Sequence, residues 1–458
     1  MRFDVGNNIY VHEPTQALKD WCKSELTLDN PEYHKKVRMG LWLGGTPENI
    51  CLYEKRGDDL ILPFGCVAEL RKLFPDVPCM SRIKPCEPFY YASGINLYPY
   101  QERAVKTALK ARNGVIVMPC GAGKTQTALQ IVSILGVRTL WLTHTQDLLN
   151  QSLNRAKSVL GCSNSSYGTI TGGKVNIGNG ITFATVQTMS KLDLTHYKDV
   201  WGCVIVDEVQ RVSGSPTQVT QFYKVLNNLS CRYKFGLTAT PKRADGLEKS
   251  MFALIGDIIC EISRDEVKDT TCPVRVKFVE TGYMPNLDMT LSGDGTINYA
   301  GLVDDLTHNS KRFECVSNTL ETLDGATLVL ANRVEYLQRL EKEYRRKSIC
   351  LSALGNSKAA KAERKEALRK LNCGEFDCVF ASYKLAAEGL DCPNLKYVVL
   401  ATPEKDSSLI QQATGRVGRK APGKEYGTVI DFVDDFGMYK SWKKKREAVY
   451  KKLGYVII

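Results

Sequence analysis

The sequence lacks the features that would assign it to a secreted, membrane-spanning or cysteine-stapled class of protein. None of its 16 cysteines belongs to a C-x-x-C pair, and many lie in apolar runs, where cysteine behaves as a small buried hydrophobe. No uncharged apolar stretch reaches the ~18–20 residues needed to cross a bilayer. The start, MRFDVGNNIYVHEP, has neither a cationic nor an apolar signal region. We therefore expect no membrane partner and a reducing compartment: cytoplasmic, or nuclear if the source is eukaryotic or viral.

Length and charge narrow the class further. A chain of 458 residues exceeds what one hydrophobic core usually supports, so two or three domains are expected. Hydrophobic residues at 43% and charged residues at 24% are typical of a globular protein. The net charge of +12 favours a polyanionic partner, although a located basic groove would be stronger support.

The spacing of apolar runs divides the chain into segments. Residues 1–90 alternate apolar and polar residues, with RGDD at 56–59 as a turn between two strands, which predicts a small α+β accessory domain and a candidate DNA-binding domain. Short apolar runs separated by helical stretches then indicate two tandem α/β domains with parallel sheets, at 91–263 and 301–440. Residues 264–300 read as a linker. Residues 441–458 read as a basic tail, either a solvated helix or a nucleic-acid contact.

The order strand, glycine loop and helix in GVIVMP, CGAGKT and QTALQIVSIL (114–135) predicts a phosphate-binding loop. Gly121 and Gly123 would let backbone N–H groups surround phosphate oxygens, Lys124 would reach the β- and γ-phosphates, and Thr125 would ligate Mg²⁺. The loop departs from the full pattern because Met118 occupies the first glycine position. The ATP contacts are completed by the remaining loop residues, Cys120, Ala122 and Gln126.

Two further motifs supply catalytic groups for ATP hydrolysis. GCVIVDEVQ places Asp207 and Glu208 at the end of an apolar strand, where open α/β sheets bind ligands. Asp207 is suited to hold Mg²⁺, and Glu208 to orient and deprotonate the attacking water. In GRVGR, Arg416 and Arg419 are three apart, so at a helix start they would share one face and could stabilise charge on the transferred phosphoryl group.

Taken together and in this order, the motifs resemble those of superfamily 2 helicases over about residues 96–435. The resemblance implies two RecA-like domains and a nucleic-acid-dependent ATPase that uses ATP and Mg²⁺. By the resemblance, YPYQ (98–101) holds an adenine-reading Gln101, and TAT (238–240) couples hydrolysis to movement of the lobes. Gly389 and Asp391 would lie near the nucleotide and the interface, and Gln412 near the γ-phosphate, with Arg416 and Arg419 as arginine fingers. The nucleic-acid contacts that it implies are Thr145, Thr185, Gln187, Arg243, Asn332 and Ser382.

Within the superfamily, LYPYQ, MPCGAGKT and GLTATPKRADG resemble XPB-type repair helicases and phage UvsW-type helicases. That branch implies a DNA helicase or translocase for forked, branched or damaged DNA, with 3′→5′ movement. Residues 243–245 read Arg-Ala-Asp where XPB-type proteins carry Arg-Glu-Asp, which weakens any duplex-opening role for this element. The expected partner is single-stranded, forked or branched DNA, ahead of RNA, and other proteins of replication, repair or restriction stay open as partners.

Three other interpretations stay open. The chain could be the motor subunit of a restriction system, although it carries no nuclease carboxylate–lysine cluster, so a partner would have to cut. It could be an RNA helicase, a reading that DEVQ in place of DEAD disfavours. It could also be a remodeller that uses ATP only as a switch, against which the presence of Glu208, Arg416 and Arg419 argues.

Overall fold

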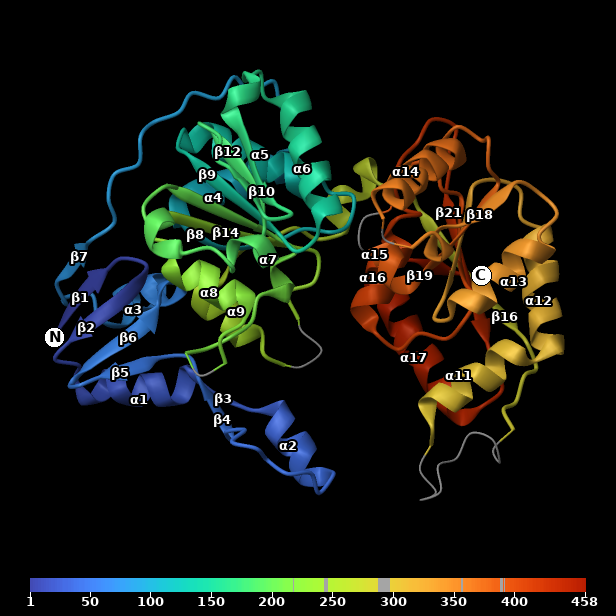
Figure 1. The fold of residues 1–458 in the computed structure, drawn as a ribbon, viewed down its shortest axis with the longest axis horizontal. Helices are drawn as coiled ribbons and strands as arrows, with labels where there is room; N and C mark the ends of the chain where they lie inside the picture. The colour runs from blue at the N-terminus through green and yellow to red at the C-terminus, as the bar shows by residue number, and fades with distance from the viewer. Residues whose placement is uncertain (217, 243–245, 287–296, 356, 388–389, 391) are drawn as a thin grey trace. The chain divides into compact units, whose positions relative to one another are not determined.

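The computed structural model describes residues 1–458 except 217, 243–245, 287–296, 356, 388–389 and 391 (Figure 1). The chain divides into two compact units. The first comprises Met1–Pro119 and Gly123–Ser263, and the second comprises Cys120–Ala122 and Arg264–Ile458. Across the described residues, every helix is too short or too polar to traverse a bilayer.

The first unit begins with a small α+β layer at its N-terminal end. Its five-stranded sheet has the order β5-β6-β2-β1-β7, in which β1 and β7 are parallel and the other pairs antiparallel. The hairpin predicted around 56–59 is present, because Arg56 pairs with Asp59 across β5 and β6. The elements are β1 (Arg2–Val5), β2 (Asn8–His12), α1 (Gln16–Glu25), β3 (Thr27–Asp29), α2 (Pro31–Arg38), β4 (Asn49–Cys51), β5 (Glu54–Arg56), β6 (Asp59–Pro63), η1 (Phe64–Cys66), α3 (Val67–Leu73) and β7 (Cys79–Ser81).

The main sheet of the first unit has eight strands in the order β11-β10-β12-β9-β13-β14-β8-β15. All neighbours are parallel except β10 and β11, and the central strands are buried on both faces, as their continuous apolar runs predict. The strands are β8 (Asn113–Val117), β9 (Thr139–Thr143), β10 (Tyr167–Thr171), β11 (Lys174–Asn176), β12 (Ile181–Thr185), β13 (Cys203–Asp207), β14 (Tyr233–Thr238) and β15 (Ile258–Glu261). The helices are α4 (Pro99–Ala111), α5 (Lys124–Leu135), α6 (Gln146–Val159), α7 (Val186–Met189), η4 (Val209–Arg211), α8 (Gln221–Asn228) and α9 (Glu248–Ile255).

The accessory sheet packs onto the main sheet domain through α9. Ala253 of α9 belongs to the apolar core of the accessory sheet. A Cβ atom on Gly65 would lie 2.2 Å from the Phe252 carbonyl oxygen and 2.5 Å from that of Ala253. Because both obstacles are backbone atoms, only glycine permits this close approach. The accessory sheet is therefore seated against the first α/β domain.

The second unit contains a seven-stranded, fully parallel sheet in the order β18-β19-β17-β20-β21-β16-β22. This confirms the second parallel-sheet domain that the sequence predicts. The strands are β16 (Val274–Glu280), β17 (Thr327–Ala331), β18 (Ser348–Cys350), β19 (Cys378–Ser382), β20 (Tyr397–Leu400), β21 (Gly427–Val433) and β22 (Val456–Ile457). The helices are α11 (Tyr299–His308), α12 (Ser310–Glu321), α13 (Val334–Glu343), α14 (Lys358–Asn372), α15 (Tyr383–Ala387), α16 (Ser407–Gly415) and α17 (Gly437–Lys452).

The segments read as a linker and a basic tail contribute to this second sheet. Strand β16 lies within 264–300 and pairs with β21 over its whole length. Helix α17 turns an aromatic and basic face inward, and β22 then adds an edge strand beside β16. The inward residues, Tyr439, Trp442, Arg446 and Tyr450, are spaced for one face of a helix. Because α17 is rich in lysine, its composition does not reveal the buried face. The segment expected to be a separate basic tail instead packs against the second sheet.

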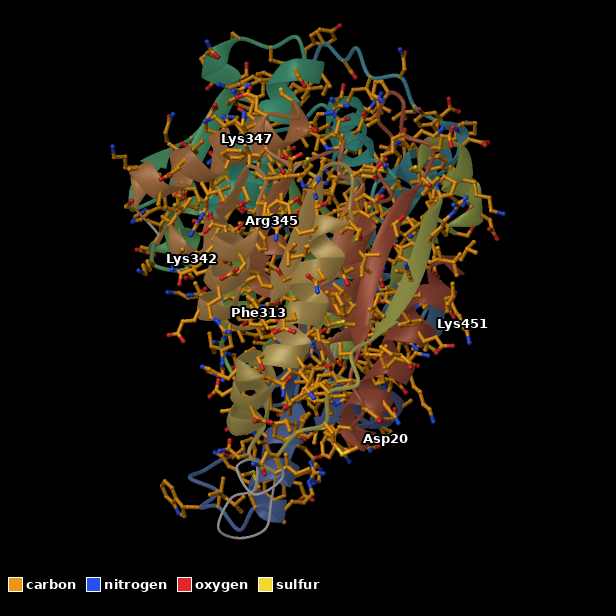
Figure 2. All side chains as sticks on the ribbon, turned by 90° about the vertical axis from the view of Figure 1, so that its right-hand side faces the viewer. Asp20, Phe313, Lys342, Arg345, Lys347 and Lys451 are labelled. Atoms are coloured by element: carbon orange, nitrogen blue, oxygen red, sulfur yellow. The ribbon has the colours of Figure 1, made fainter. Side chains whose placement is uncertain are left out.

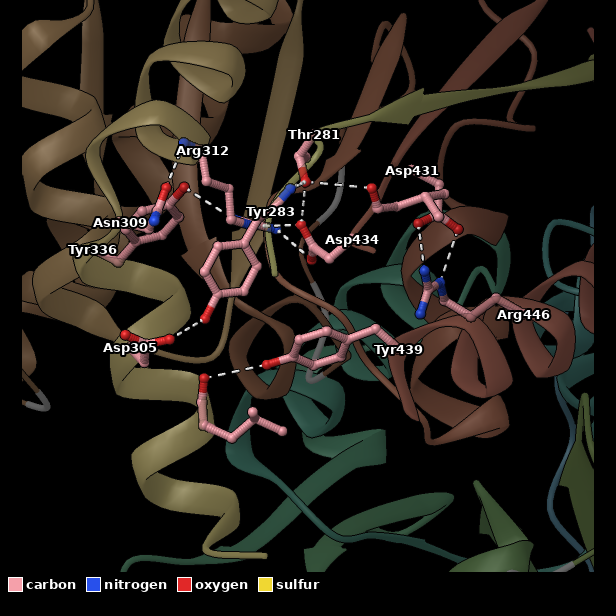
Figure 3. A network of polar contacts seen from close by, with 12 residues as sticks. Thr281, Tyr283, Asp305, Asn309, Arg312, Tyr336, Asp431, Asp434, Tyr439 and Arg446 are labelled. Atoms are coloured by element: carbon pink, nitrogen blue, oxygen red, sulfur yellow. Dashed lines mark hydrogen bonds and ion pairs between the residues drawn. The ribbon is translucent and has the colours of Figure 1, made fainter. Parts of the chain in front are cut away.

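Two buried arginine–aspartate pairs fix helices to the end of β21 (Figure 3). Arg312 of α12 donates from Nε and Nη2 to the Asp434 carboxylate at 2.8 and 3.2 Å. Arg446 of α17 donates to both oxygens of Asp431 at 2.8 Å, and Tyr450 Oη donates to the same carboxylate at 2.8 Å. Charges this deeply buried are tolerated because each is paired bidentately.

Exposed cations gather at one end of α13. Figure 2 labels Lys342, Arg345 and Lys347, which lie in the last turn of α13 and in the segment that follows it. Cations at a helix C-terminus interact favourably with the helix dipole. Lys342 lies in the last turn and so stabilises α13 in this way, whereas Arg345 and Lys347 lie beyond the C-cap Tyr344, on the exposed surface.

Candidate ATP site and nucleic-acid contacts

Three motifs meet at one edge of the first sheet. The phosphate-binding loop follows β8, Asp207 ends β13 and Thr238 ends β14, and these three strands are neighbours in the order β13-β14-β8. All three are parallel, so their carboxyl ends lie at the same edge, where open α/β sheets bind ligands.

The loop itself has the geometry of an anion cradle. Gly121 and Gly123 adopt left-handed conformations, with φ of 84° and 80°. Helix α5 starts at Lys124, and Gly123 at its N-cap provides no side-chain cap for the first-turn N–H groups. Those N–H groups and the helix dipole suit a phosphate. Lys124 Nζ lies 3.5 Å from the Met118 carbonyl oxygen, on the same loop.

Gln101 supports the loop from the neighbouring helix. It is 2% exposed, and its Oε1 accepts a hydrogen bond from the Tyr98 N–H at 3.0 Å, which caps α4. A Cβ atom on Gly123 would lie 2.4 Å from Gln101 Nε2. The side chain thus lies directly against the phosphate-binding loop, and its adenine-reading role remains a prediction.

The other loop residues differ in what they present. Ala122 is 1% exposed and Cys120 is half-buried. Gln126 Nε2 donates to the Asn96 carbonyl oxygen at 3.0 Å, and its Oε1 accepts from Arg155. Because its side chain is bound within the protein, we expect Gln126 to contact phosphate through its backbone N–H in the first turn of α5.

Asp207 is a buried carboxylate that suits a divalent cation. It is 6% exposed, and its Oδ1 accepts from the Glu208 N–H at 3.0 Å. Burial raises its pKa, the charge of Glu208 raises it further, and the charge of Lys124 opposes both. A cation would compensate this desolvated negative charge. Mg²⁺ prefers one or two carboxylates together with phosphate oxygens and water, so Asp207 and the Thr125 hydroxyl fit the ion.

Glu208 is held in a strained conformation at the start of η4. Its φ of 53° is left-handed, which is uncommon for a residue with a Cβ and is concentrated at functional sites. Gln210 Nε2 donates to Glu208 Oε2 at 2.6 Å, and Thr238 Oγ1 donates to Gln210 Oε1 at 2.7 Å. Thr240 N–H in turn donates to Thr238 Oγ1 at 2.9 Å. Sequence reasoning missed Gln210, although its place two residues after Glu208 in DEVQ is a usable signal.

Three predicted nucleic-acid residues of the first unit lie at or just after the ends of the adjacent strands β9 and β12. Thr145 Oγ1 accepts from the Leu148 N–H at 3.3 Å and caps α6. Thr185 Oγ1 donates to Thr188 Oγ1 at 3.0 Å. Gln187 Nε2 donates to the His144 carbonyl oxygen at 2.8 Å, so it ties the two loops together. Their contact with nucleic acid stays a prediction.

In the second unit, two predicted contacts lie at or just after the ends of the adjacent strands β17 and β19. The Asn332 N–H donates to Thr402 Oγ1 at 3.0 Å, and its Nδ2 donates to the Pro403 carbonyl oxygen at 3.3 Å. Ser382 Oγ accepts from the Leu385 N–H at 3.3 Å and caps α15. Arg243, Gly389 and Asp391 lie outside the described residues.

The arginine pair occupies a different local structure from the one predicted. Gln412 lies half-buried in α16, and this helix ends at Gly415. Arg416 is the C-cap and Arg419 lies three residues beyond it, so the pair follows a helix end and not a helix start. Arg416 Nη1 donates to the Leu390 carbonyl oxygen, and the Arg419 carbonyl oxygen accepts from Lys424 Nζ at 2.9 Å.

Comparison with known proteins identifies two matching families and several relatives. The family described as type III restriction enzyme, res subunit, matches residues 94–243, and the helicase conserved C-terminal domain matches residues 311–421. A putative ATP-dependent RNA helicase of Acanthamoeba polyphaga mimivirus is 26% identical over 399 residues, covering 84% of this chain and 73% of the relative. The DNA 3′-5′ translocase XPB2 of Sulfurisphaera tokodaii is 27% identical over 366 residues, covering 71% of this chain and 79% of the relative.

A solved structure shares the fold. The fragment of a putative HsdR subunit of a type I restriction enzyme from Vibrio vulnificus has a TM-score of 0.57 and 19% identity. The match covers 80% of this chain and 68% of that chain. At this identity the likeness concerns the fold alone.

Proposed function

Since the chain belongs to the superfamily 2 helicases and translocases, we propose that it is a nucleic-acid-dependent ATPase that moves on or remodels DNA. The substrates proposed are forked, branched or damaged DNA, and the processes proposed are DNA repair and recombination. The observation that carries the proposal is the meeting of the phosphate-binding loop, Asp207 and Thr238 at one sheet edge.

The residues at this edge divide the work of ATP hydrolysis. The first-turn amides of α5 and Lys124 would bind the phosphates, while Thr125 and Asp207 would hold Mg²⁺. When bound, the ion supplies charge neutralisation at the phosphates. Glu208 would orient and deprotonate the attacking water, and the 2.6 Å hydrogen bond from Gln210 would keep its carboxylate in place.

The second unit would complete the reaction. We propose that Gln412, Arg416 and Arg419 act on the γ-phosphate when the two units close, so that hydrolysis depends on their relative movement. Gly389 and Asp391 would contribute near the nucleotide.

The proposed track is a nucleic-acid backbone. Hydroxyls, amides and backbone N–H groups of the loops around Thr145, Thr185, Gln187, Asn332 and Ser382 would contact phosphates, with Arg243 adding charge. Such contacts carry little sequence information and weaken with salt. DNA is favoured because relatives are named DNA 3′-5′ translocases or helicases, which also suggests 3′→5′ movement. The mimivirus relative keeps RNA as the alternative.

The test is ATP turnover with forked, duplex and single-stranded DNA and with RNA, each at matched nucleotide concentration. We expect DNA to raise turnover several-fold, with forks the strongest ligand, and we expect Glu208→Gln to cut turnover ~10²–10⁴-fold with every ligand. Stimulation by RNA alone would overturn the DNA assignment. Turnover indifferent to all four ligands would overturn the motor.

A second candidate is the motor subunit of a restriction complex. The match of residues 94–243 to a restriction-enzyme family favours it. Such a motor moves along duplex DNA without separating strands. Displacement of a third strand from a triplex, without unwinding of a fork, would favour this candidate over a helicase.

A further inference from the structure

The arm formed by residues 30–48 presents apolar side chains to solvent. In the first unit, the β3–β4 ribbon carries this arm, with α2 on it, away from the five-stranded sheet (Figure 1). Val37, Met39, Leu41 and Trp42 are 53%, 60%, 52% and 88% exposed. Helix α2 buries none of its residues. Contiguous exposed apolar groups on a soluble protein mark a binding surface.

The arm is built by specific hydrogen bonds. Asn30, which is 1% exposed, accepts from the Glu32 N–H at 3.1 Å and donates from Nδ2 to the Pro47 carbonyl oxygen at 2.7 Å. Lys36 Nζ crosses the arm and donates to Thr46 Oγ1 at 2.6 Å. These hydrogen bonds join the first half of the arm to its second half, at Pro47 and Thr46. They therefore fix the base from which the apolar tip projects.

The indole ring of Trp42 packs against the backbone of Gly44. A Cβ atom on Gly44 would lie 3.0 Å from Trp42 Cζ3 and 3.1 Å from Cε3, so the ring edge lies against the Gly44 backbone. Gly44 has φ of +55°, where a side chain would also be strained. One edge of the ring is supported while most of its surface stays exposed, which is the arrangement of a stacking platform.

The positive charge of residues 33–45, the tip of the arm, favours an anionic polymer as its ligand. Between residues 33 and 45 the sequence YHKKVRMGLWLGG carries Lys35, Lys36 and Arg38 and no acidic residue. Cations interleaved with an exposed aromatic ring suit nucleic acid, in which the cations meet phosphates and the ring stacks on a base. Apolar side chains also insert between base steps, most readily where the stack is already interrupted.

We propose that the arm is a branch-point reader: Lys35 and Arg38 bind backbone phosphates, and Trp42 stacks on an unpaired or unstacked base at a fork or junction. Val37, Met39 and Leu41 flank the ring and exclude water from it. The inference rests on the proposed function, because it takes DNA as the substrate. It adds a structure-specific contact separate from the ATP site.

Trp42 offers a direct readout. The chain has five tryptophans, and Trp141, Trp201 and Trp442 are 0%, 1% and 9% exposed while Trp21 is partly buried. Acrylamide quenching of the full chain therefore reports chiefly on Trp42. A saturating fork should protect this fluorescence from acrylamide, and a perfect duplex of the same length should protect it far less.

Affinity measurements complete the test. We expect Trp42→Ala to weaken fork binding about tenfold, to change perfect-duplex binding by less than twofold, and to leave ATP turnover stimulated by single-stranded DNA unchanged. Because Trp42 is 88% exposed, the variant should fold. Tyr90→Ala is the matched control, since Tyr90 is 86% exposed and lies outside the arm; it should leave fork affinity unchanged.

Two results would overturn the proposal. Equal quenching with and without a fork, in protein whose ATPase responds to that fork, would show that Trp42 does not meet DNA. Protection that rises with protein concentration in the absence of DNA would assign the arm to contact with a second copy of the chain. If DNA fails to stimulate wild-type ATP turnover, the failure belongs to the proposed function and not to the arm.

Discussion

Lys234 has a side-chain amine that is buried where the accessory sheet packs against the first α/β domain. Its side chain is 1% exposed, its Nζ donates to the Leu226 carbonyl oxygen at 3.0 Å, and it lies 4.5 Å from the centroid of the Phe64 ring. Burial lowers the pKa of Lys234 from 10.5 to about 8, and Cys231 opposes this only in part. We predict that the free energy of unfolding of the wild-type protein rises with pH relative to that of Lys234→Met.

The sign follows from proton uptake on unfolding. Below pH 8 the lysine is charged in both states, so the fold carries the full cost of burying the charge. Between pH 8 and 10.5 the folded lysine is neutral and the unfolded one still charged, so the unfolded state binds more protons and stability rises with pH. The slope is at most ~1.4 kcal/mol per pH unit. From pH 7 to 10, the free energy of unfolding of the wild-type protein should therefore rise by ~2.5 kcal/mol relative to that of the Met variant.

The assay is urea unfolding of both proteins at pH 7, 8, 9 and 10, followed by tryptophan fluorescence. The quantity to compare is the wild-type free energy of unfolding minus that of Lys234→Met. Losses that do not titrate, such as the carbonyl left without its donor, shift this difference equally at every pH. Lys224→Met removes an exposed lysine that also donates to a backbone carbonyl, and it controls for net charge. A difference that stays flat from pH 7 to 10 would refute the burial argument.

Four predictions concern the ATP site. Glu208→Gln should cut turnover ~10²–10⁴-fold in a steady-state ATPase assay, with nucleotide binding retained in titrations. Lys124→Ala should weaken nucleotide binding and turnover together, because the lost charge contacts phosphate before and during the reaction. Gln210→Leu should lower kcat about tenfold and leave KM for ATP within twofold, since it removes the 2.6 Å bond to Glu208 and the acceptor of the Thr238 hydroxyl but no predicted nucleotide contact; an unchanged kcat would contradict this role. Arg419→Ala should remove DNA stimulation while gel-shift affinity persists, and retained stimulation would argue against a finger.

Much of the fold could be read from the sequence because parallel strands buried on both faces are continuous apolar runs. GCVIVDE became β13, with Asp207 at its end, and GVIVMP became β8 and the start of the phosphate-binding loop. The hairpin around 56–59 was readable for a different reason, since a glycine turn lies between two alternating runs. Each prediction rests on local physics alone.

The second unit shows where local patterns are insufficient. Helix α17 reads as a lysine-rich tail because its buried face includes Tyr439, Arg446 and Tyr450. These side chains carry polar groups, so the sequence shows no apolar stripe that would predict a buried face. Arg446 is buried only because Asp431, on β21, supplies a bidentate partner. The spacing of the aromatic residues was visible in advance. Which carboxylate neutralises the arginine depends on the three-dimensional pairing of elements, which no periodicity reveals.

The short helix η4 (Val209–Arg211) lies between the proposed ATP site and the loops of the first unit that are proposed to contact nucleic acid. Its middle residue, Gln210, links Glu208 to Thr238. At its end, Arg211 Nη1 lies 3.2 Å from His144 Nε2, and the His144 carbonyl oxygen accepts from Gln187. Because η4 is a single turn that directly follows the strained Glu208, we propose that a shift of Glu208 is passed on to Arg211. The carboxylate proposed as the general base and the loops proposed to hold nucleic acid are thus linked through η4 by these contacts, and we propose that coupling between them follows this path.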